Sequence, residues 1–181
     1  MSGTRKKPRE KRDIMHNELT ASDIKKMEEE IEYRKLVVRK NALEDVKEAR
    51  AQGDLSENFE YYAAKKFKNQ NESRIRYLER MIKTATVISD DSKEDEVGMN
   101  NSVEVLFEED GSVETYRIVT TVRGNSLEGL VSNESPIGKA LLGHKVGDRV
   151  CVEVDPTYSY YLVIRKIDKT NDDSQDKLRS F

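Results

Sequence analysis

The sequence predicts an α+β protein in which an antiparallel α-helical hairpin is followed by a small antiparallel β-sheet domain with one short helix. Two long stretches of helical apolar periodicity fill its first half, and the period changes to two in its second half. Hydrophobic residues make up only 35% of the 181 residues and charged residues 37%. This is too little apolar material for one compact globule, but it suits an extended hairpin joined to a smaller domain with its own core.

Composition also excludes several classes of protein. A net charge of −3 does not indicate a free nucleic-acid binder. The single cysteine, Cys151, rules out an intramolecular disulfide and a cysteine-based zinc site, and we expect it to be an ordinary strand residue. No apolar run approaches the ~18 residues of a membrane span, and no signal peptide opens the chain. We therefore expect a cytoplasmic protein without a membrane partner.

Residues 1–19 are expected to form a disordered basic tail. The stretch "MSGTRKKPREKRD" holds many more basic than acidic residues and has no apolar periodicity. Weak attraction to nucleic acid and simple solubilisation are both compatible with this pattern.

The first arm of the hairpin begins at Thr20, which forms a capping box with Asp23. Leu19 and Ile24 stand at the spacing of a hydrophobic staple. Apolar residues then recur in steps that line one helix face, namely Ile24, Met27, Ile31, Val38, Ala42, Val46 and Ala49. The pattern stops at Gly53, a natural C-cap, so about 30 residues make an arm roughly 45 Å long.

The second arm carries a matching apolar face and is expected to end near Thr84. The residues of this face are Phe59, Ala63, Phe67, Ile75, Leu78 and Ile82, with Asn71 at the intermediate position. Neither amphipathic helix can bury its apolar face alone, so the two must fold back on each other. The sequence thus predicts an antiparallel coiled-coil hairpin over residues 20–86, with its tip at "QGDLSEN".

A polar linker at 87–100 is followed by the sheet domain, expected over 101–168. Alternating residues predict five strands, at 102–108, 113–120, 126–131, 149–155 and 159–167. The Asp110-Gly111 pair is a good hairpin turn. Ser135 as N-cap, Pro136 at the first helical position and Gly143 after the last turn predict a short helix. Residues 169–181 are expected to be a second disordered tail.

The tip segment 53–58 contains acidic residues whose presence has two explanations. In the first, Asp54 is the N-cap of the second helix and Glu57, three residues later, nearly completes a capping box. In the second, both carboxylates face outward to bind a metal ion. Two carboxylates hold Mg²⁺ poorly by themselves, but they could help hold a second ion in a site that already contains one. The two explanations are compatible.

The second arm is also basic behind the tip. Its candidate nucleic-acid-facing residues are Lys65, Lys66, Lys68, Arg74 and Arg76. A rod that passes close to RNA phosphates requires such a face. A solvated surface balanced by Glu72 and Glu79 explains the same residues equally well.

Two segments resemble the GreA/GreB family of bacterial transcript cleavage factors. "GDLSENFEYYAAKKFKNQNESRIRYLERMI" resembles the family's tip and descending helix, in which the pattern GDL-x-EN-x-EY-x-AAK follows a long helix. "NESPIGKALLGHKVGDRV" resembles its C-terminal segment S-P-[ILMV]-[GA]-x-A-[LI]-[LI]-G-x-x-x-GD. Two long motifs in the family's order and spacing are far more specific than one short pattern, and "DLSEN" favours the GreA type.

The resemblance implies an FKBP-like C-terminal domain that docks at the rim of the secondary channel of RNA polymerase, while the coiled coil reaches the active centre. The factor would then stimulate the polymerase to cleave the 3′ end of backtracked nascent RNA within the DNA-bound elongation complex, rescuing arrested complexes. It would not be an enzyme itself. It would act as a monomer and have no cofactor of its own, sharing only the Mg²⁺ of the polymerase active site.

The resemblance also implies roles for individual residues. Asp54 and Glu57 match the tip acids that contribute catalytic metal ligation. The residues that match the shape and flanks of the tip are Gly53, Ser56, Asn58, Glu60 and Tyr61. Those that match the polymerase-docking segment are Ser135, Pro136, Ile137 and Gly138, which are also an ordinary helix start.

The chain departs from the family pattern in its basic N-terminal extension and at residues 156–161, where "PTYSYY" replaces the usual P-x-G turn. Three other functions remain open at this point. An anti-cleavage paralogue would occupy the same channel, although an inhibitor does not need Asp54 and Glu57. An FKBP-like isomerase or chaperone would need an apolar proline pocket, for which the domain has few aromatic residues. In a pure scaffold, the tip acids would only cap the helix.

Overall fold

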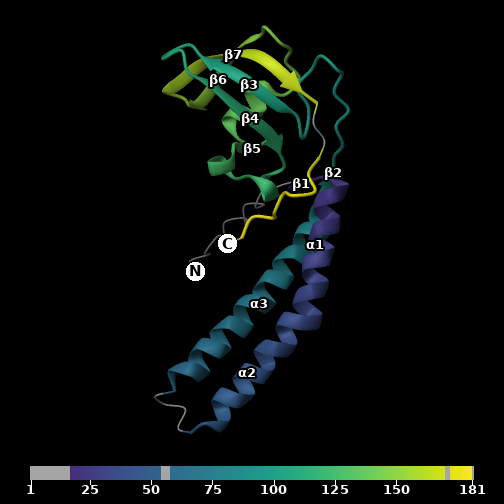
Figure 1. Cartoon of the computed structure of the whole chain (residues 1–181), viewed down its shortest axis with the longest axis vertical. Helices are drawn as coiled ribbons and strands as arrows, with labels where there is room; N and C mark the ends of the chain where they lie inside the picture. Colours follow the sequence, from purple (N-terminus) through teal and green to yellow (C-terminus); the bar gives the residue numbers. More distant parts are fainter. Residues whose placement is uncertain (1–16, 54–57, 170–171, 181) are drawn as a thin grey trace, which may run out of the picture.

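The computed structural model describes residues 17–53, 58–169 and 172–180. A long arm of two antiparallel helices carries a globular domain at one end (Figure 1). The predicted α+β architecture, a helical hairpin followed by a sheet domain with a short helix, is confirmed. Most of the expected basic tail lies outside the described residues, and its last three residues form strand β1 (Asn17–Leu19).

The first arm is one long helix in three pieces: α1 (Ala21–Tyr33), a π-helical segment η1 (Arg34–Val38) and α2 (Arg39–Ala51). The predicted capping box is present, because Thr20 Oγ1 accepts the Asp23 N–H at 3.2 Å and Asp23 Oδ2 accepts the Thr20 N–H at 2.9 Å. Leu19 and Ile24 pack in one apolar cluster, as the staple spacing predicted. Helix starts of this kind are local, so the sequence determines them directly.

The π-helical segment faces a buried asparagine of the other arm. The Arg39 N–H reaches back five residues to the Arg34 carbonyl, which defines the wider turn. Asn71, only 2% exposed, donates from Nδ2 to the same carbonyl at 3.4 Å and accepts from Arg34 Nη1 at 3.2 Å. Asn71 therefore satisfies its own polar groups and fixes the register of the two arms.

The second arm is helix α3 (Phe59–Thr84), which ends where the sequence predicted. The predicted apolar face is confirmed near the globular domain, where Ile75 and Leu78 are buried. It is wrong near the tip, where Phe59 and Phe67 are 86% and 49% exposed, and Ala63 is exposed as well. In that half the helix turns a different face toward the first arm, made by the half-buried Tyr61, Ala64 and Lys68.

The globular domain is built on a five-stranded sheet of order β5-β4-β3-β7-β6. Its strands are β3 (Ser102–Phe107), β4 (Val113–Val119), β5 (Leu130–Ser132), β6 (Arg149–Asp155) and β7 (Tyr158–Asp168). The pairs of β3 with β4, β3 with β7 and β6 with β7 are antiparallel, as predicted. The short β5 differs, because it pairs with β4 in parallel and makes the sheet mixed. Two 3₁₀ turns, η2 (Thr121–Arg123) and η3 (Ser126–Glu128), separate β4 from β5 and account for this change of direction.

Helix α4 (Pro136–Leu141) packs against the sheet and begins with the predicted cap. The core between them contains alternate residues of the strands, including Val103, Val105 and Leu162. Part of the expected linker also enters this core, since Val97 and Met99 are buried in it. The end of the expected linker, around Val97 and Met99, thus belongs to the structure of the domain.

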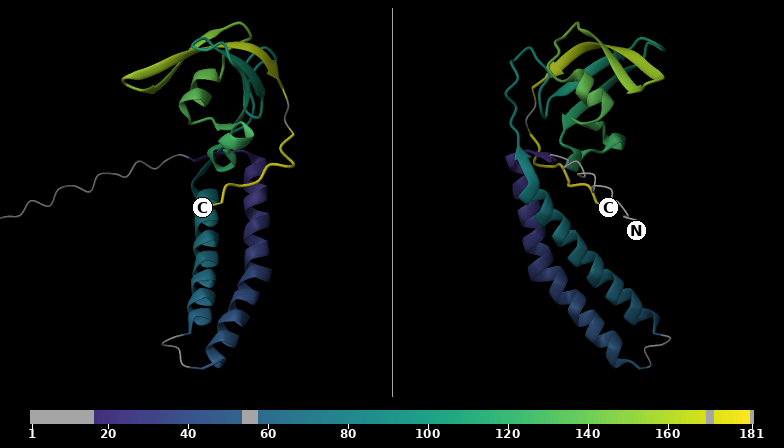
Figure 2. Two further views of the ribbon diagram at one scale, coloured as in Figure 1. Left: turned by 60° about the vertical axis from the view of Figure 1, so that its left-hand side comes forward. Right: turned by 180° about the vertical axis from the view of Figure 1, so that it is seen from behind.

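The arm and the globular domain meet at a small parallel sheet of β1 and β2 (Ala85–Val87). Beneath it, an apolar cluster joins both parts, since it includes Met27 and Leu78 of the arm and Val122 of η2. The C-terminal segment, residues 172–180, returns from the sheet to this junction (Figures 1 and 2). Within the described ranges, no helix is both long and apolar enough to cross a membrane.

Candidate functional site

The acidic tip is bounded by two well-defined helix ends. The backbone leaves α2 through Gly53, whose φ of 134° favours glycine. On the other side Asn58 is the N-cap of α3, with Oδ1 accepting the Tyr61 N–H at 2.9 Å. Asn58 Nδ2 also donates to the Ala49 carbonyl in the last turn of α2 at 2.7 Å. One side chain thus ties the ends of both arms together beside the tip.

The tip residues Asp54, Ser56 and Glu57 lie outside the described residues. Their surroundings nevertheless correct one expectation. Because α3 begins at Phe59 and is capped by Asn58, the hypothesis that Asp54 is the N-cap of this helix is wrong. An N-cap immediately precedes the first helical turn, and Asp54 comes four residues earlier. The start of α3 therefore does not explain why the tip carries acids.

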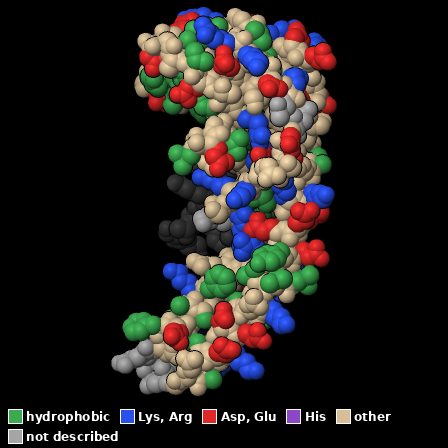
Figure 3. Space-filling view, in the orientation of Figure 1, with side chains coloured by type: hydrophobic (Ala, Val, Ile, Leu, Met, Phe, Trp, Pro, Cys, Tyr) green, Lys and Arg blue, Asp and Glu red, His purple; other side chains and the backbone are tan. Residues whose placement is uncertain are grey.

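The face of α3 behind the tip combines basic and aromatic side chains. Lys65 and Lys66 are exposed, and Lys65 Nζ lies 5.9 Å from the centre of the half-buried Tyr61 ring. Tyr62 is 53% exposed beside them, so this half of the arm presents unburied aromatic surface. Figure 3 shows apolar side chains at the surface along the lower half of the arm. Lysines next to exposed aromatic rings are suited to phosphates and bases.

The other predicted basic residues differ in their exposure. Arg76 is exposed and donates to Ser73 Oγ at 3.1 Å, and Lys68 is half-buried. Glu60 is an exposed acid in the first turn of α3, where it suits the helix dipole. Glu72, one of the acids expected to balance this face, forms a two-pronged ion pair with Arg39 across the arms at 2.7 and 2.8 Å.

Arg74 is a correction to the expected nucleic-acid face. It is only 9% exposed, and its Nε and Nη2 donate to the two carboxylate oxygens of Glu30 at 2.9 and 3.0 Å. Arg34 Nε donates to the same carboxylate at 2.7 Å. Burial raises the pKa of Glu30, but these arginine hydrogen bonds outweigh burial and leave the pKa below its ordinary value of 4.5. Arg74 is thus an inter-arm contact rather than a surface cation.

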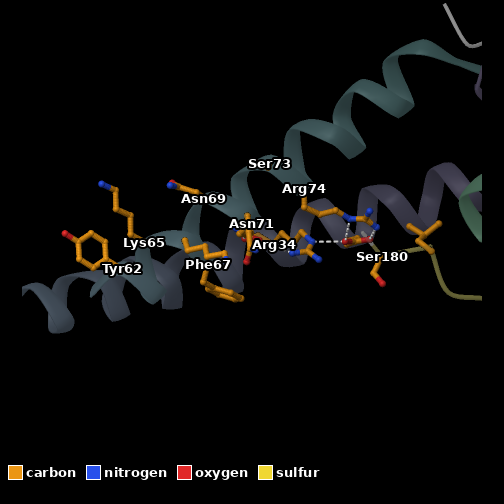
Figure 4. Close-up of a pocket in the computed structure, with 13 residues that line it drawn as sticks. Arg34, Tyr62, Lys65, Phe67, Asn69, Asn71, Ser73, Arg74 and Ser180 are labelled. Atoms are coloured by element: carbon orange, nitrogen blue, oxygen red, sulfur yellow. Dashed lines mark hydrogen bonds and ion pairs between the residues drawn. The ribbon is translucent and has the colours of Figure 1, made fainter. Parts of the chain in front are cut away.

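A groove of about 1060 Å³ runs along the arm, and the ion-paired Glu30, Arg34 and Arg74 are among the residues that line it (Figure 4). Tyr62, Lys65 and Phe67 lie toward the tip, while the ion pairs of Arg34 and Arg74 lie toward the globular domain. Ser180 of the C-terminal segment lies at that inner end. The groove therefore has an open basic and aromatic half and an inner half whose charges are already paired.

The segment expected to dock on a partner is held as a helix start. Ser135 Oγ accepts the Gly138 N–H at 3.1 Å and donates to the Ser132 carbonyl at 2.6 Å. Gly138 is buried so close to that carbonyl that a Cβ would lie 2.0 Å from its oxygen. Ile137 packs against the core, and Pro136 is exposed. Of the four residues, Pro136 is the one most open to a partner.

A complete metal site is not present in the part of the chain that the structure describes. No group of three or more His, Cys, Asp or Glu side chains there could hold a metal ion. Cys151 is an exposed, free thiol on strand β6.

The fold and site define a two-part α+β protein in which an acidic tip lies at the far end of a helical arm from a sheet domain. Two family models match it: "Transcription elongation factor, N-terminal" over residues 17–87 and "Transcription elongation factor, GreA/GreB, C-term" over 91–169. The chain belongs to the GreA/GreB family of transcription elongation factors.

Curated relatives named transcription elongation factor GreA agree with this assignment. The protein of Geobacillus kaustophilus is 46% identical over 136 residues, which are 75% of this chain and 86% of the relative. That of Thermoanaerobacter pseudethanolicus is 48% identical over 137 residues, covering 75% and 87%. Among solved structures, GreA factor homolog 1 (Gfh1) of Thermus thermophilus aligns over 83% of this chain and 97% of its own at 26% identity, with a TM-score of only 0.38.

Proposed function

We propose that this chain inserts its arm into the secondary channel of bacterial RNA polymerase and stimulates cleavage of the 3′ end of backtracked nascent RNA. The capping of α3 by Asn58 is the observation that supports this proposal most strongly. Because Asn58 already fills that role, Asp54 and Glu57 are left without a task in starting the helix. Acidic side chains at the end of the arm are then best explained as groups that act on another molecule.

The dimensions of the arm fit such a delivery. Helix α3 has 26 residues, which at ~1.5 Å each span roughly 39 Å. The tip therefore lies several nanometres from the globular domain that carries the arm. Ion pairs and hydrogen bonds across the two arms, such as those of Glu72 and Asn71, stiffen this rod along its length.

In this proposal, Asp54 and Glu57 supply carboxylate oxygens to Mg²⁺ held in the polymerase active centre. Mg²⁺ usually takes one or two carboxylates besides phosphate and water, so a pair of acids suits a shared site and not a separate one. The reaction belongs to the polymerase, and this chain is not itself an enzyme. Lys65, Lys66 and Arg76 face RNA phosphates, and the exposed Pro136 contributes to docking at the channel rim.

The test is RNA cleavage in a stalled, backtracked elongation complex with Mg²⁺. The Asp54→Asn/Glu57→Gln variant is compared with the wild type and with Glu44→Gln/Asp45→Asn. The control makes the same chemical changes at exposed acids of α2, away from the tip. We expect the tip variant to lose at least about tenfold in stimulated cleavage while it still competes for the polymerase, because removing even the outer partners of a metal site costs about 10- to 100-fold. The control should stimulate like the wild type.

The other outcomes assign other functions. Wild-type protein that competes for the channel but does not stimulate cleavage would indicate an anti-cleavage regulator. Equal stimulation by all three proteins would refute metal ligation by the tip. Since Asn58 holds the cap, the free energy of unfolding of the tip variant should change by less than ~1 kcal/mol. If the tip variant lost more stability than this together with its cleavage activity, the acids would have a structural role.

A further inference from the structure

The C-terminal segment, residues 172–180, lies beyond both family-model matches, the second of which ends at residue 169. It was expected to be a disordered tail, but the structure differs. The segment runs from the end of the sheet down to the junction between the arm and the globular domain (Figures 1 and 2). Along the chain, the segment makes polar contacts through Asp173 and Asp176 and then an apolar contact through Leu178.

The polar contacts centre on Arg123, a fully buried arginine in η2. Its Nε lies 2.6 Å from Oδ1 of Asp23, the partner of Thr20 in the capping box of α1. On the other side, Arg123 Nη1 donates to Asp176 Oδ2 at 2.8 Å and lies 3.4 Å from Asp173 Oδ2. Arg123 is therefore enclosed by carboxylates from the arm and from the C-terminal segment.

Further cations of both parts hold the same two aspartates. Arg117 of β4 forms an ion pair with Asp176. Lys26 of α1 donates to the backbone carbonyls of Asp173 and Asp176, the latter at 3.0 Å. The segment thus bridges a lysine of the arm and two arginines of the globular domain.

The residues after Asp176 continue the contact. The Arg179 N–H donates to the Val122 carbonyl in η2 at 2.7 Å. Leu178 packs against the apolar cluster that joins the two parts, near Met27 and Leu78. The ion pairs of Arg123 with Asp173 and Asp176 are largely buried, so salt should weaken them much less than it weakens a surface ion pair.

We propose that Arg123, Arg117 and Lys26 form a built-in docking site for the acidic C-terminal segment of the same chain, and that its occupancy fixes the globular domain on the arm. A buried arginine requires paired carboxylates, and those on the segment come from beyond the domain that holds the arginine. The segment contacts both parts at once, so releasing it removes bonds across the junction. This inference concerns the chain alone and does not depend on the proposed cleavage activity.

The first measurement is amide hydrogen exchange at Leu178 and Arg179 in the full-length chain. Asp176→Ala removes the carboxylate that meets both arginines. Asp172→Ala is the matched control, because the carboxylate of this exposed acid accepts the Ser174 N–H, and Asp172 meets Arg117 through its backbone carbonyl, which alanine keeps. We expect at least a tenfold loss of protection at Arg179 in Asp176→Ala alone, with protection of the strand β3 amides unchanged.

The second measurement is the distance between spin labels on the two parts. The native Cys151 is exposed on β6, and Lys40→Cys supplies an exposed partner on α2. We expect one narrow distance distribution in the background protein and in Asp172→Ala, and a broader or shifted one in Asp176→Ala. An Arg179 amide without protection in the wild type would overturn the docking site. If Asp176→Ala lost protection at Arg179 but kept the distance distribution of the background protein, the segment would have no role in fixing the domain.

Discussion

Replacing Asn58 tests how the arms are held together at the tip. Its side chain makes two separate bonds: Oδ1 accepts the Tyr61 N–H and caps α3, and Nδ2 donates to the Ala49 carbonyl of α2. Asn58→Ala removes both. Asn58→Asp keeps an acceptor of equal capping strength but removes the donor, and it places a carboxylate against a carbonyl oxygen. The pair of variants therefore separates the cap from the bond between the arms.

The magnitudes follow from these two bonds. Loss of an N-cap costs about 1 kcal/mol, and loss of a typical hydrogen bond also about 1 kcal/mol. Asn58→Ala should thus lower the free energy of unfolding by about 2 kcal/mol and Asn58→Asp by about 1 kcal/mol. The control is Asn69→Ala, which changes an exposed asparagine of α3 and should be neutral or slightly stabilising because alanine favours helix.

Urea denaturation followed by circular dichroism at 222 nm measures these differences, with amide exchange at Tyr61 as a local readout. Asn58→Ala should lose protection at Tyr61, while Asn58→Asp should retain it. If Asn58→Ala were no less stable than Asn69→Ala, the tie between the arms would be wrong. If both Asn58 variants lost the same stability, the cap would contribute nothing and the division between the two bonds would fail.

Two further predictions concern other parts of the molecule. The pKa of Glu30 is lowered in the folded state, so the unfolded chain binds this proton first as the pH falls. Between pH 7 and a pH below the ordinary value of 4.5, the wild type should therefore lose more stability than Glu30→Gln. Equal losses in denaturant titrations would contradict the ion-pair account. Gly138→Ala should cost about 1–3 kcal/mol in thermal denaturation, because its Cβ would meet the Ser132 carbonyl. Gly124→Ala is the control, since its nearest contact would be an ordinary 3.5 Å, and similar losses in both variants would argue against a specific clash.

Much of the fold could be predicted because the relevant signals are local. The capping box of Thr20 and Asp23 and the proline start of α4 depend on residues a few positions apart. The face of α3 near the tip could not be predicted in this way. Apolar residues occur on two overlapping faces there, so periodicity alone does not choose between Phe67 and Ala64. The choice is made by contact with the other arm.

The site shows the same division. The acids of the tip were noted from the sequence itself, and the family resemblance implied their role as metal ligands, which stays a prediction. The capping role was assigned to the wrong residue because Asp54 and Asn58 are both good caps. The C-terminal segment was misjudged because its aspartates look like solvated tail residues. Their partner Arg123 is 53 positions away from Asp176, and no local pattern signals an ion pair at that separation.

The contact of Asn71 with the π-helical segment also affects how far the arm extends from the globular domain. Two helices joined only by an apolar seam can slide by one heptad, which would move one arm past the other by about 10 Å. Such a slide would bury Asn71 without its partners on Arg34, and an unsatisfied buried amide is costly. The arm therefore has one favoured reach. The distance from the globular domain to the end of the arm is therefore set in part by a buried amide in the middle of the arm.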